Sequence, residues 1–336
     1  MAAEPLKTLF HPFEAEALPL PRKDARILFL GAEPGFRLPR DFDAALHLVQ
    51  GFRPHFSALQ ASGYTVTPRV EGSGYEAALV LSGRHRGQNE MRIAQAIECV
   101  TPGGLIVVAG SKDDGIDSLR KRINALAPLE GHLPKHHGVA FWLRSVGPSV
   151  AEALRGANPA VTVDGRFHTA PGMFSFDRID AGSKFLAAHL PGDLRGNVAD
   201  FCAGWGYLAA EIAARSPDLA GLDLFEADFE ALEAARLNVR PGALEPRFFW
   251  TDLLTETVER RYDTIVMNPP FHSSRAAEPE IGAGMIRAAS RALKPGGKLF
   301  MVANRQLPYE QVLAAAFSSH VEIARDGAFK VFSARR

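Results

Sequence analysis

Residues 197–207 read Asn-Val-Ala-Asp-Phe-Cys-Ala-Gly-Trp-Gly-Tyr. Asn197–Phe201 is a short apolar run, which predicts a buried strand. Gly204 and Gly206 follow it in a turn, and Tyr207–Ala214 has the composition of a helix. A strand, a glycine turn and a helix in this order are the opening unit of a parallel α/β sheet.

The rest of the C-terminal half continues this alternation. Two consecutive prolines, Pro269 and Pro270, stop one apolar run, because proline cannot continue a central strand. Strands that alternate with helices predict a doubly wound parallel sheet with helices on both faces. The further expected elements are strands Leu219–Phe225, Tyr262–Met267 and Lys298–Ala303, helices Phe229–Asn238 and Ile281–Leu293, and a turn at Pro295-Gly296-Gly297.

The N-terminal half repeats the same order of patterns. Three matches support an internal duplication, so that the fold expected is α/β with two tandem Rossmann-like domains. Two unrelated α/β domains with common turn residues are the alternative. The matched pairs are Tyr75–Leu81 with Tyr262–Met267, Thr101–Ala109 with Lys294–Ala303, and Gly138–Leu143 with Gly327–Phe332.

A change of composition separates the two halves. Gly147-Pro148 and Asn158-Pro159 are typical of a linker. Asp164-Gly165 lies between two short β-type runs and predicts a hairpin that opens the second domain. We therefore expect domains at 1–155 and 156–336.

Composition excludes several classes of protein. The 336 residues are 46% hydrophobic and 23% charged, which is typical of a globular protein rather than a disordered one. No apolar run approaches the ~18 residues of a membrane helix, and the N-terminus has no signal-peptide pattern. Two cysteines cannot form a disulfide framework, so a cytoplasmic location is expected. Basic and acidic residues number 38 each, which gives no sign of a polycation.

The two copies differ where ligands bind. In open α/β sheets, ligands bind at the carboxyl ends of the strands. Asn268–His272 corresponds to Leu81–His85 in the first copy, and Asp200–Gly206 corresponds to Phe29–Gly35, which has no acid in the first position. The chemistry is therefore expected in the C-terminal copy, with the first copy degenerate.

Acidic residues follow successive strands of the second copy. Asp200 precedes the glycine turn, and Glu226, directly after the next strand, is suited to the two hydroxyls of a ribose. Asp252 follows Arg247–Trp250 and is suited to an adenine amine, although a helix N-cap is an equal alternative. Glu226 has its own alternative as a solvated acid near a helix start. Together these acids indicate an adenosine-containing ligand.

Asn268-Pro269-Pro270-Phe271 is the most specific motif. The prolines fix the backbone after a buried strand, and the Asn268 side chain and Pro269 carbonyl are both acceptors. Two acceptors suit the two N–H bonds of a planar exocyclic amine and stabilise it as it becomes pyramidal. Phe271 is suited to stacking on a base. A simple strand stop is the structural alternative.

Other chemistries lack their residues. The histidines of Lys135-His136-His137 and His272 have no spaced set of further ligands, so we expect no metal. No Gly-x-Ser-x-Gly motif is present, and no Gly-x-Gly-x-x-Gly fingerprint of a dehydrogenase begins at Asp200.

At these residues the sequence resembles the class I S-adenosylmethionine-dependent methyltransferases, and more narrowly the bacterial 16S ribosomal RNA small subunit methyltransferase C (guanine-N2) family and its large-subunit relatives. Members pair a degenerate N-terminal copy with an active C-terminal one. The residues that carry the resemblance are Phe174-Ser175, Asp180–Ser183, Asp200–Gly206, Asn268–His272, Val302–Asn304, Leu307–Tyr309 and Gly327–Val331.

The resemblance implies a role for each matching residue. S-adenosylmethionine is the implied cofactor, with Asp200, Gly204 and Gly206 around its methionine moiety and Ser183 near its carboxylate. Glu226 would bind the ribose and Asp252 the adenine. Asn268, Pro269 and Phe271 would receive the guanine amine, Pro270 would hold them rigid, and the first domain would bind RNA or assist folding.

The sequence departs from the family at two places in the glycine turn. Cys202 stands in the cofactor-binding loop where the family usually has glycine, and Trp205 stands where it has a small residue. Either side chain could crowd the methionine moiety. We expect Cys202 to be accommodated because Gly204 and Gly206 make the closest approach.

We therefore expect a monomeric enzyme that methylates the N2 amine of a guanine in ribosomal RNA, most simply in 16S RNA of the small subunit. A methyltransferase acting on adenine N6 or on protein glutamine has the same four-residue motif. The alternative of another class is a noncatalytic factor for ribosome assembly that binds RNA.

Overall fold

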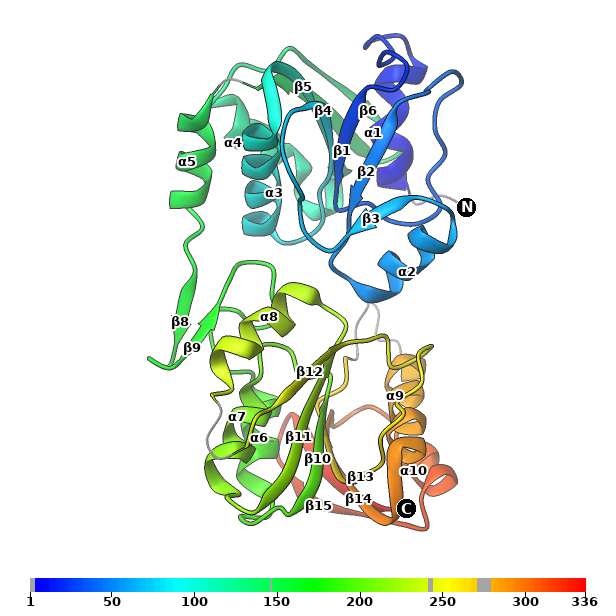
Figure 1. Ribbon diagram of the computed structural model, residues 1–336, viewed down its shortest axis with the longest axis vertical. Coiled ribbons are helices and arrows are strands. Elements are labelled where there is room, and N and C mark those ends of the chain that lie inside the picture. Colours follow the sequence, from blue (N-terminus) through cyan, green and yellow to red (C-terminus); the bar gives the residue numbers. More distant parts are fainter. Residues whose placement is uncertain (1–3, 146, 241–243, 271–278) are drawn as a thin grey trace. The chain divides into compact units, whose positions relative to one another are not determined.

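The computed structural model describes residues 4–145, 147–240, 244–270 and 279–336. The chain divides into two compact units (Figure 1). Unit 1 comprises Met1–Ala160 with Ala170–Gly172, and unit 2 comprises Val161–Thr169 with Met173–Arg336. No helix of the described residues is long and apolar enough to cross a membrane.

Each unit contains a seven-stranded sheet, and the two sheets have the same strand order. In unit 1 the order is β3-β2-β1-β4-β5-β7-β6, and in unit 2 it is β12-β11-β10-β13-β14-β16-β15. The first five strands in each order are parallel, and the last two pair antiparallel. The predicted α/β architecture with two Rossmann-like copies is confirmed.

The strands of unit 1 are β1 (Arg26–Leu30), β2 (Ala45–Val49), β3 (Thr65–Thr67), β4 (Tyr75–Leu81), β5 (Val100–Ser111), β6 (Gly131–Lys135) and β7 (Gly138–Arg144). The strands of unit 2 are β8 (Val161–Val163), β9 (Phe167–Thr169), β10 (Gly196–Phe201), β11 (Leu219–Glu226), β12 (Arg247–Trp250), β13 (Tyr262–Met267), β14 (Leu293–Asn304), β15 (Ser319–Arg325) and β16 (Phe329–Arg335).

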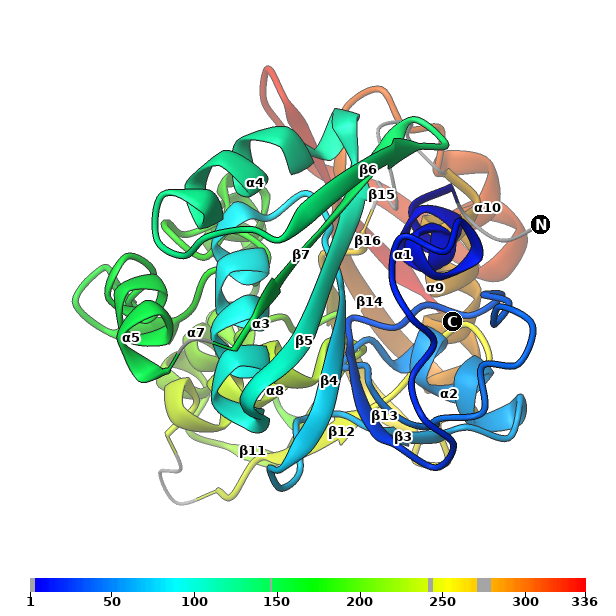
Figure 2. The ribbon, with the colours of Figure 1, turned by 90° about the horizontal axis from the view of Figure 1, so that it is seen from above.

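Helices lie on both faces of the sheet in unit 1, as Figure 2 shows for α1 on one side and α3 and α4 on the other. The helices of unit 1 are α1 (Glu4–Glu14), α2 (Arg53–Ala61), α3 (Arg86–Cys99), α4 (Ile116–Asn124) and α5 (Pro148–Gly156). Those of unit 2 are α6 (Ala181–His189), α7 (Tyr207–Arg215), α8 (Phe229–Asn238), α9 (Pro279–Ala292) and α10 (Glu310–Ala316).

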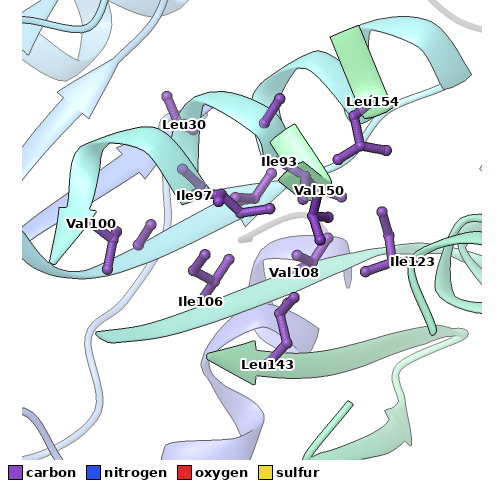
Figure 3. Close-up of a cluster of buried hydrophobic side chains, with 14 of the residues drawn as sticks. Leu30, Ile93, Ile97, Val100, Ile106, Val108, Ile123, Leu143, Val150 and Leu154 are labelled. Atoms are coloured by element: carbon purple, nitrogen blue, oxygen red, sulfur yellow. The ribbon is translucent and has the colours of Figure 1, made fainter. Parts of the chain in front are cut away.

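An apolar layer fills the space between the sheet and the helices on each face of unit 1. Ile93 and Ile97 of α3 lie opposite Ile106 and Val108 of β5 and are fully buried or nearly so (Figure 3). Val150 of α5 closes the same layer. Unit 2 has its own buried cluster, centred on β10, β13, β14 and α9. Each sheet is therefore covered by its own helices and has its own core.

The prediction of a turn at Pro295-Gly296-Gly297 before the strand is wrong, because this segment lies within the long strand β14, where it forms an irregularity. Tyr262 pairs with Leu293, and the next registered pair is Thr264 with Lys298, so that extra residues of β14 are left between them. Gly296 has a φ of +77° there. Unit 1 has the same shift of register between β4 and β5, which is further support for the duplication.

The hairpin predicted around Asp164-Gly165 is present as β8 and β9. Both turn residues have positive φ, of 53° and 64°, as a tight hairpin turn requires. The closing strand β16 begins at Phe329 rather than at Gly327. Glu226 is the last residue of β11 rather than the first residue after it.

Candidate active site

The polar residues expected to act together lie at one edge of the unit 2 sheet. Strands β10, β11 and β13 run parallel, with β10 between the other two. Asp200 lies next to the end of β10, Glu226 ends β11, and Asn268 follows β13. The carboxyl ends of three neighbouring strands therefore bring these side chains to the same edge of the sheet.

Asp200 is fully buried with one oxygen unsatisfied. Its Oδ2 accepts the Ala209 N–H at 3.0 Å, whereas none of the described residues gives a hydrogen bond to its Oδ1. Burial raises the pKa of Asp200 to about 8, and the nearby Glu226 carboxylate adds to the rise. A buried acceptor without a donor is costly, and a cationic ligand group would satisfy it.

The loop after β10 places three of its residues in the left-handed region of the backbone. Cys202 has a φ of 59°, Gly204 of 54° and Gly206 of 89°. A Cβ atom on Gly204 would meet no atom of the described residues within 4 Å, but one on Gly206 would lie 2.8 Å from Val239 Cγ2. Gly206 is thus needed for the close packing of this loop on α8, as well as for its φ.

The Cys202 side chain is half-buried and packs against the apolar cluster of unit 2. Burial raises the pKa of its thiol well above the ordinary value, with the Glu226 and Asp200 carboxylates contributing. Cys202 therefore stays a neutral, apolar group in a backbone conformation that favours glycine.

The Trp205 ring packs against the hairpin strand β9. Its centroid lies 5.2 Å from that of Phe167 and 6.1 Å from that of Tyr207. Its indole N–H donates to the Phe174 carbonyl at 2.9 Å. These contacts use the bulky ring to attach the loop to β9 and to the segment after it.

Glu226 holds the loop from the side of β11. Its Oε2 accepts the Gly204 N–H at 2.7 Å, and its Oε1 accepts the N–H groups of Ala227 and Asp228, both at 2.8 Å. Burial raises the pKa of Glu226 to about 7, although these backbone donors oppose the rise. Glu226 thus fixes Gly204 and retains acceptor capacity for a ligand hydroxyl.

Asn268 is fixed by the first turn of α6. Its Nδ2 donates to Asp180 Oδ2 at 2.9 Å and to Ser183 Oγ at 2.8 Å. Asp180 is the N-cap of α6 and also accepts the Ser183 N–H. Both N–H groups of the Asn268 carboxamide thus donate hydrogen bonds within the protein, and its Oδ1 is the atom suited to accept a hydrogen bond from a ligand.

The other residues predicted for the site are Asp252, Pro269, Pro270 and Phe271. The Asp252 side chain accepts the Leu254 N–H and the Thr255 hydroxyl, as in the capping alternative. Pro269 is buried and Pro270 is exposed. Phe271 lies outside the described residues.

Two positioning residues were not predicted as parts of the site. Asp180 has a helix-start signal, but its contact with Asn268 joins residues 88 positions apart. Asn238, at the end of α8, donates to the Trp205 and His168 carbonyls and accepts the His168 N–H. Asn238 therefore ties the glycine loop to β9, and no local pattern indicates this.

Unit 1 has different residues at the equivalent positions. Leu30 pairs with Val49 and Val80 as Phe201 pairs with Phe225 and Met267, so that the equivalent residues follow from the register. The residues equivalent to Glu226, Asn268 and Cys202 are then Gln50, Leu81 and Gly31.

Side chains of unit 1 itself occupy this region of its sheet. Gln50 donates to the Ala32 carbonyl at 2.6 Å and accepts the Phe52 N–H, so it keeps the loop contact of Glu226 without the charge. Arg92 donates to the Leu81 carbonyl at 2.9 Å, and its Nη1 would lie 2.6 Å from a Cβ on Gly31. The guanidinium thus lies between the ends of β1 and β4.

Within the described ranges, no group of three or more His, Cys, Asp or Glu side chains could hold a metal ion.

Comparisons with known proteins show which family the chain is similar to. The model of the family described as "Methyltransferase small domain" matches residues 164–333. The ribosomal RNA small subunit methyltransferase C of Klebsiella pneumoniae is 32% identical over 252 residues, which are 74% of this chain and 72% of that protein. The protein of the same name from Salmonella choleraesuis is 30% identical over 250 residues, with the same coverage of each chain.

A solved structure extends the likeness over both units. The T. thermophilus 16S rRNA N2 G1207 methyltransferase, in complex with AdoMet and guanosine, has a TM-score of 0.80 and 24% identity, and the match covers 99% of this chain and 92% of that one. This likeness supports the fold. The family model and the identity to the curated relatives go further: the chain belongs to the ribosomal RNA small subunit methyltransferase C family, with its methyltransferase small domain in the C-terminal half.

Proposed function

We propose that this chain transfers a methyl group from S-adenosylmethionine to the exocyclic N2 amine of a guanine in 16S ribosomal RNA. The observation that carries the proposal is the fixed carboxamide of Asn268, held by Asp180 and Ser183 beside the buried Asp200 and the glycine loop. Family membership supplies the reaction class, and the names of the relatives supply the RNA.

The residues of unit 2 fit the cofactor. The unpaired Oδ1 of Asp200 is suited to the cationic amine of a methionine moiety, and Gly204 leaves open space where a Cβ would otherwise stand. Glu226 is suited to ribose hydroxyls, and Asp252 to the adenine amine. We assign Ser183, Cys202 and Gly206 to the same site, Gly206 through the shape of its loop. When bound, the cofactor supplies a methyl group on a sulfonium centre with a good leaving group.

Asn268 and Pro269 act on the guanine amine. The nitrogen lone pair of such an amine is delocalised into the ring, which makes it a poor nucleophile. The Asn268 Oδ1 and Pro269 carbonyl accept its two N–H hydrogens and stabilise the nitrogen as it becomes pyramidal. The contacts of Asn268 with Asp180 and Ser183 keep Oδ1 in position before the substrate arrives. Pro270 restricts the backbone of Pro269, which carries the second acceptor, and Phe271 would stack on the base.

The substrate must present an unpaired guanine, because N2 is not accessible to this site inside a duplex. A ribosomal substrate also places the activity in the cytoplasm. We propose a monomer, in which unit 1, the degenerate copy, contributes to RNA binding or to folding.

The test is the transfer of labelled methyl groups from S-adenosylmethionine to undermethylated small subunits, large subunits and free ribosomal RNA. We expect N2-methylguanine in small-subunit RNA, loss of transfer in Asn268→Ala, and full transfer in Asp193→Asn, a control on the exposed surface. Label in N6-methyladenine or in protein would contradict the guanine assignment. Binding of RNA without binding of the cofactor would favour the noncatalytic assembly factor.

A further inference from the structure

Phe174 has an unusual environment for an aromatic residue of this chain. Its side chain is 60% exposed. In the part of the chain that the structure describes, Phe52 is the only other Phe, Tyr or Trp in the exposed class. The exposed part of a phenyl ring gains nothing from the hydrophobic effect in the free protein, so such a ring is a candidate for contact with a ligand.

The backbone that presents this ring is fixed. The Phe174 carbonyl accepts the Trp205 indole N–H at 2.9 Å, and the preceding residue, Met173, is buried. On the other side, Ser175 Oγ donates to the Arg178 carbonyl, and the Arg178 N–H donates to the Ser175 carbonyl. Phe174 is therefore exposed because the loop holds it outward, rather than because the loop lacks contacts.

The loop connects two parts of the proposed active site. At its start, Phe174 contacts Trp205 in the loop that follows β10. At its end, Asp180 holds Asn268, which follows β13. Because β10 and β13 are neighbouring strands, the segment 174–180 crosses the edge of the sheet at which the cofactor and the amine are proposed to meet.

A cationic side chain accompanies the aromatic ring. The Arg178 side chain is 77% exposed, and its ion pair with Asp177, at 3.5 Å, is a surface pair of little energetic value. An exposed aromatic ring with an exposed arginine is the combination that binds unpaired nucleotides, because the ring stacks on a base and the guanidinium contacts a phosphate.

We propose that Phe174 is the stacking platform for an unpaired base that flanks the target guanine, with Arg178 on the neighbouring phosphate. The inference rests on the proposed function. The flanking base is favoured over the target itself because a ring with this exposure lies at the protein surface, whereas the target amine must reach the half-buried Asn268.

The test compares four variants on undermethylated small subunits: Phe174→Ala, Phe174→Leu, Phe174→Trp and the control Val321→Ala. Val321 is 56% exposed on β15, so its replacement removes a comparable exposed apolar group. We expect kcat/KM to fall about ten-fold in Phe174→Ala, mainly through KM, because base stacking is worth about that factor or more. Phe174→Leu should behave like Phe174→Ala, and Phe174→Trp like wild type.

Calorimetric affinity for S-adenosylmethionine separates stacking from a structural effect of the loop. It should be the same in all four variants and wild type. The proposal is overturned if Phe174→Ala equals Val321→Ala, if Phe174→Leu restores activity, or if cofactor affinity falls in parallel with activity. Absence of methylation by the wild-type protein on every RNA would instead refute the proposed function, and the stacking role with it.

Discussion

Replacement of Asp200 by asparagine should change how the stability of the protein depends on pH. Asp200 is buried, and its pKa is raised from 3.8 to about 8. Between these values the folded protein holds a proton on Asp200 that the unfolded chain releases. The free energy of unfolding therefore falls as pH rises from about 4 to about 8. A carboxamide does not titrate in this range, so Asp200→Asn lacks this loss.

The expected magnitude follows from the two pKa values. Each unit of pKa shift corresponds to about 1.4 kcal/mol. Relative to its value below pH 4, the free energy of unfolding of wild type is therefore lower by at most about 2 kcal/mol at pH 5 and about 6 kcal/mol at pH 9. The upper limit for the change in relative stability is thus about 4 kcal/mol. Relaxation of the loop and entry of water reduce such penalties, so we expect about 2 kcal/mol.

Urea unfolding followed by circular dichroism at pH 5, 7 and 9 measures this difference. Asp200→Asn keeps an acceptor for the Ala209 N–H and should become more stable relative to wild type as pH rises. The titration of Glu226 is common to both proteins and largely cancels. The exposed control Asp193→Asn should show a constant difference from wild type. A constant difference for Asp200→Asn as well would refute the argument from burial.

Three further predictions concern the site. Asn268→Ala should lower the single-turnover rate of methyl transfer at least a hundred-fold, the range for loss of one transition-state contact, while calorimetric cofactor affinity changes much less; an equal loss of both would contradict the acceptor role. Cys202→Gly should be about 1 kcal/mol more stable to urea unfolding than Cys202→Ala, because only alanine keeps the strain of a φ of 59°. The cofactor affinity of Cys202→Gly should equal that of wild type. Gly206→Ala should lower the free energy of unfolding by about 2–3 kcal/mol and Gly35→Ala by about 1 kcal/mol, since φ is 89° and 88° but only the Gly206 Cβ would meet neighbours; equal losses would exclude the packing contribution of Val239.

Local signals in the sequence were sufficient for much of the fold. Helix Phe229–Asn238 and strand Tyr262–Met267 have the predicted bounds, because helical spacing defines the first and a proline pair ends the second. The edge of the sheet that carries Asp200, Glu226 and Asn268 also follows from strand order alone, since parallel strands end on the same side.

Contacts between distant segments could not be predicted. Nothing near Asn268 indicates that Asp180 fixes its carboxamide, and nothing near Asn238 indicates a bond to the Trp205 carbonyl. Pro295-Gly296-Gly297 predicts a turn and is an irregularity of β14 instead, because this composition is typical of both. Local composition constrains the φ angle of each residue. The two side-chain contacts and the irregularity of β14 depend instead on which distant segment packs or pairs with these residues.

The guanidinium of Arg92 in unit 1 makes the divergence of the two copies hard to reverse. Acidic residues in place of Phe29 and Gln50 would give unit 1 the two carboxylates that Asp200 and Glu226 supply in unit 2. The Arg92 side chain would still extend between the ends of β1 and β4. Its removal would in turn leave the Leu81 carbonyl without that donor. Several substitutions would have to occur together before any one of them was advantageous. Rebuilding the unit 2 arrangement in unit 1 therefore requires several coordinated substitutions, including one at Arg92.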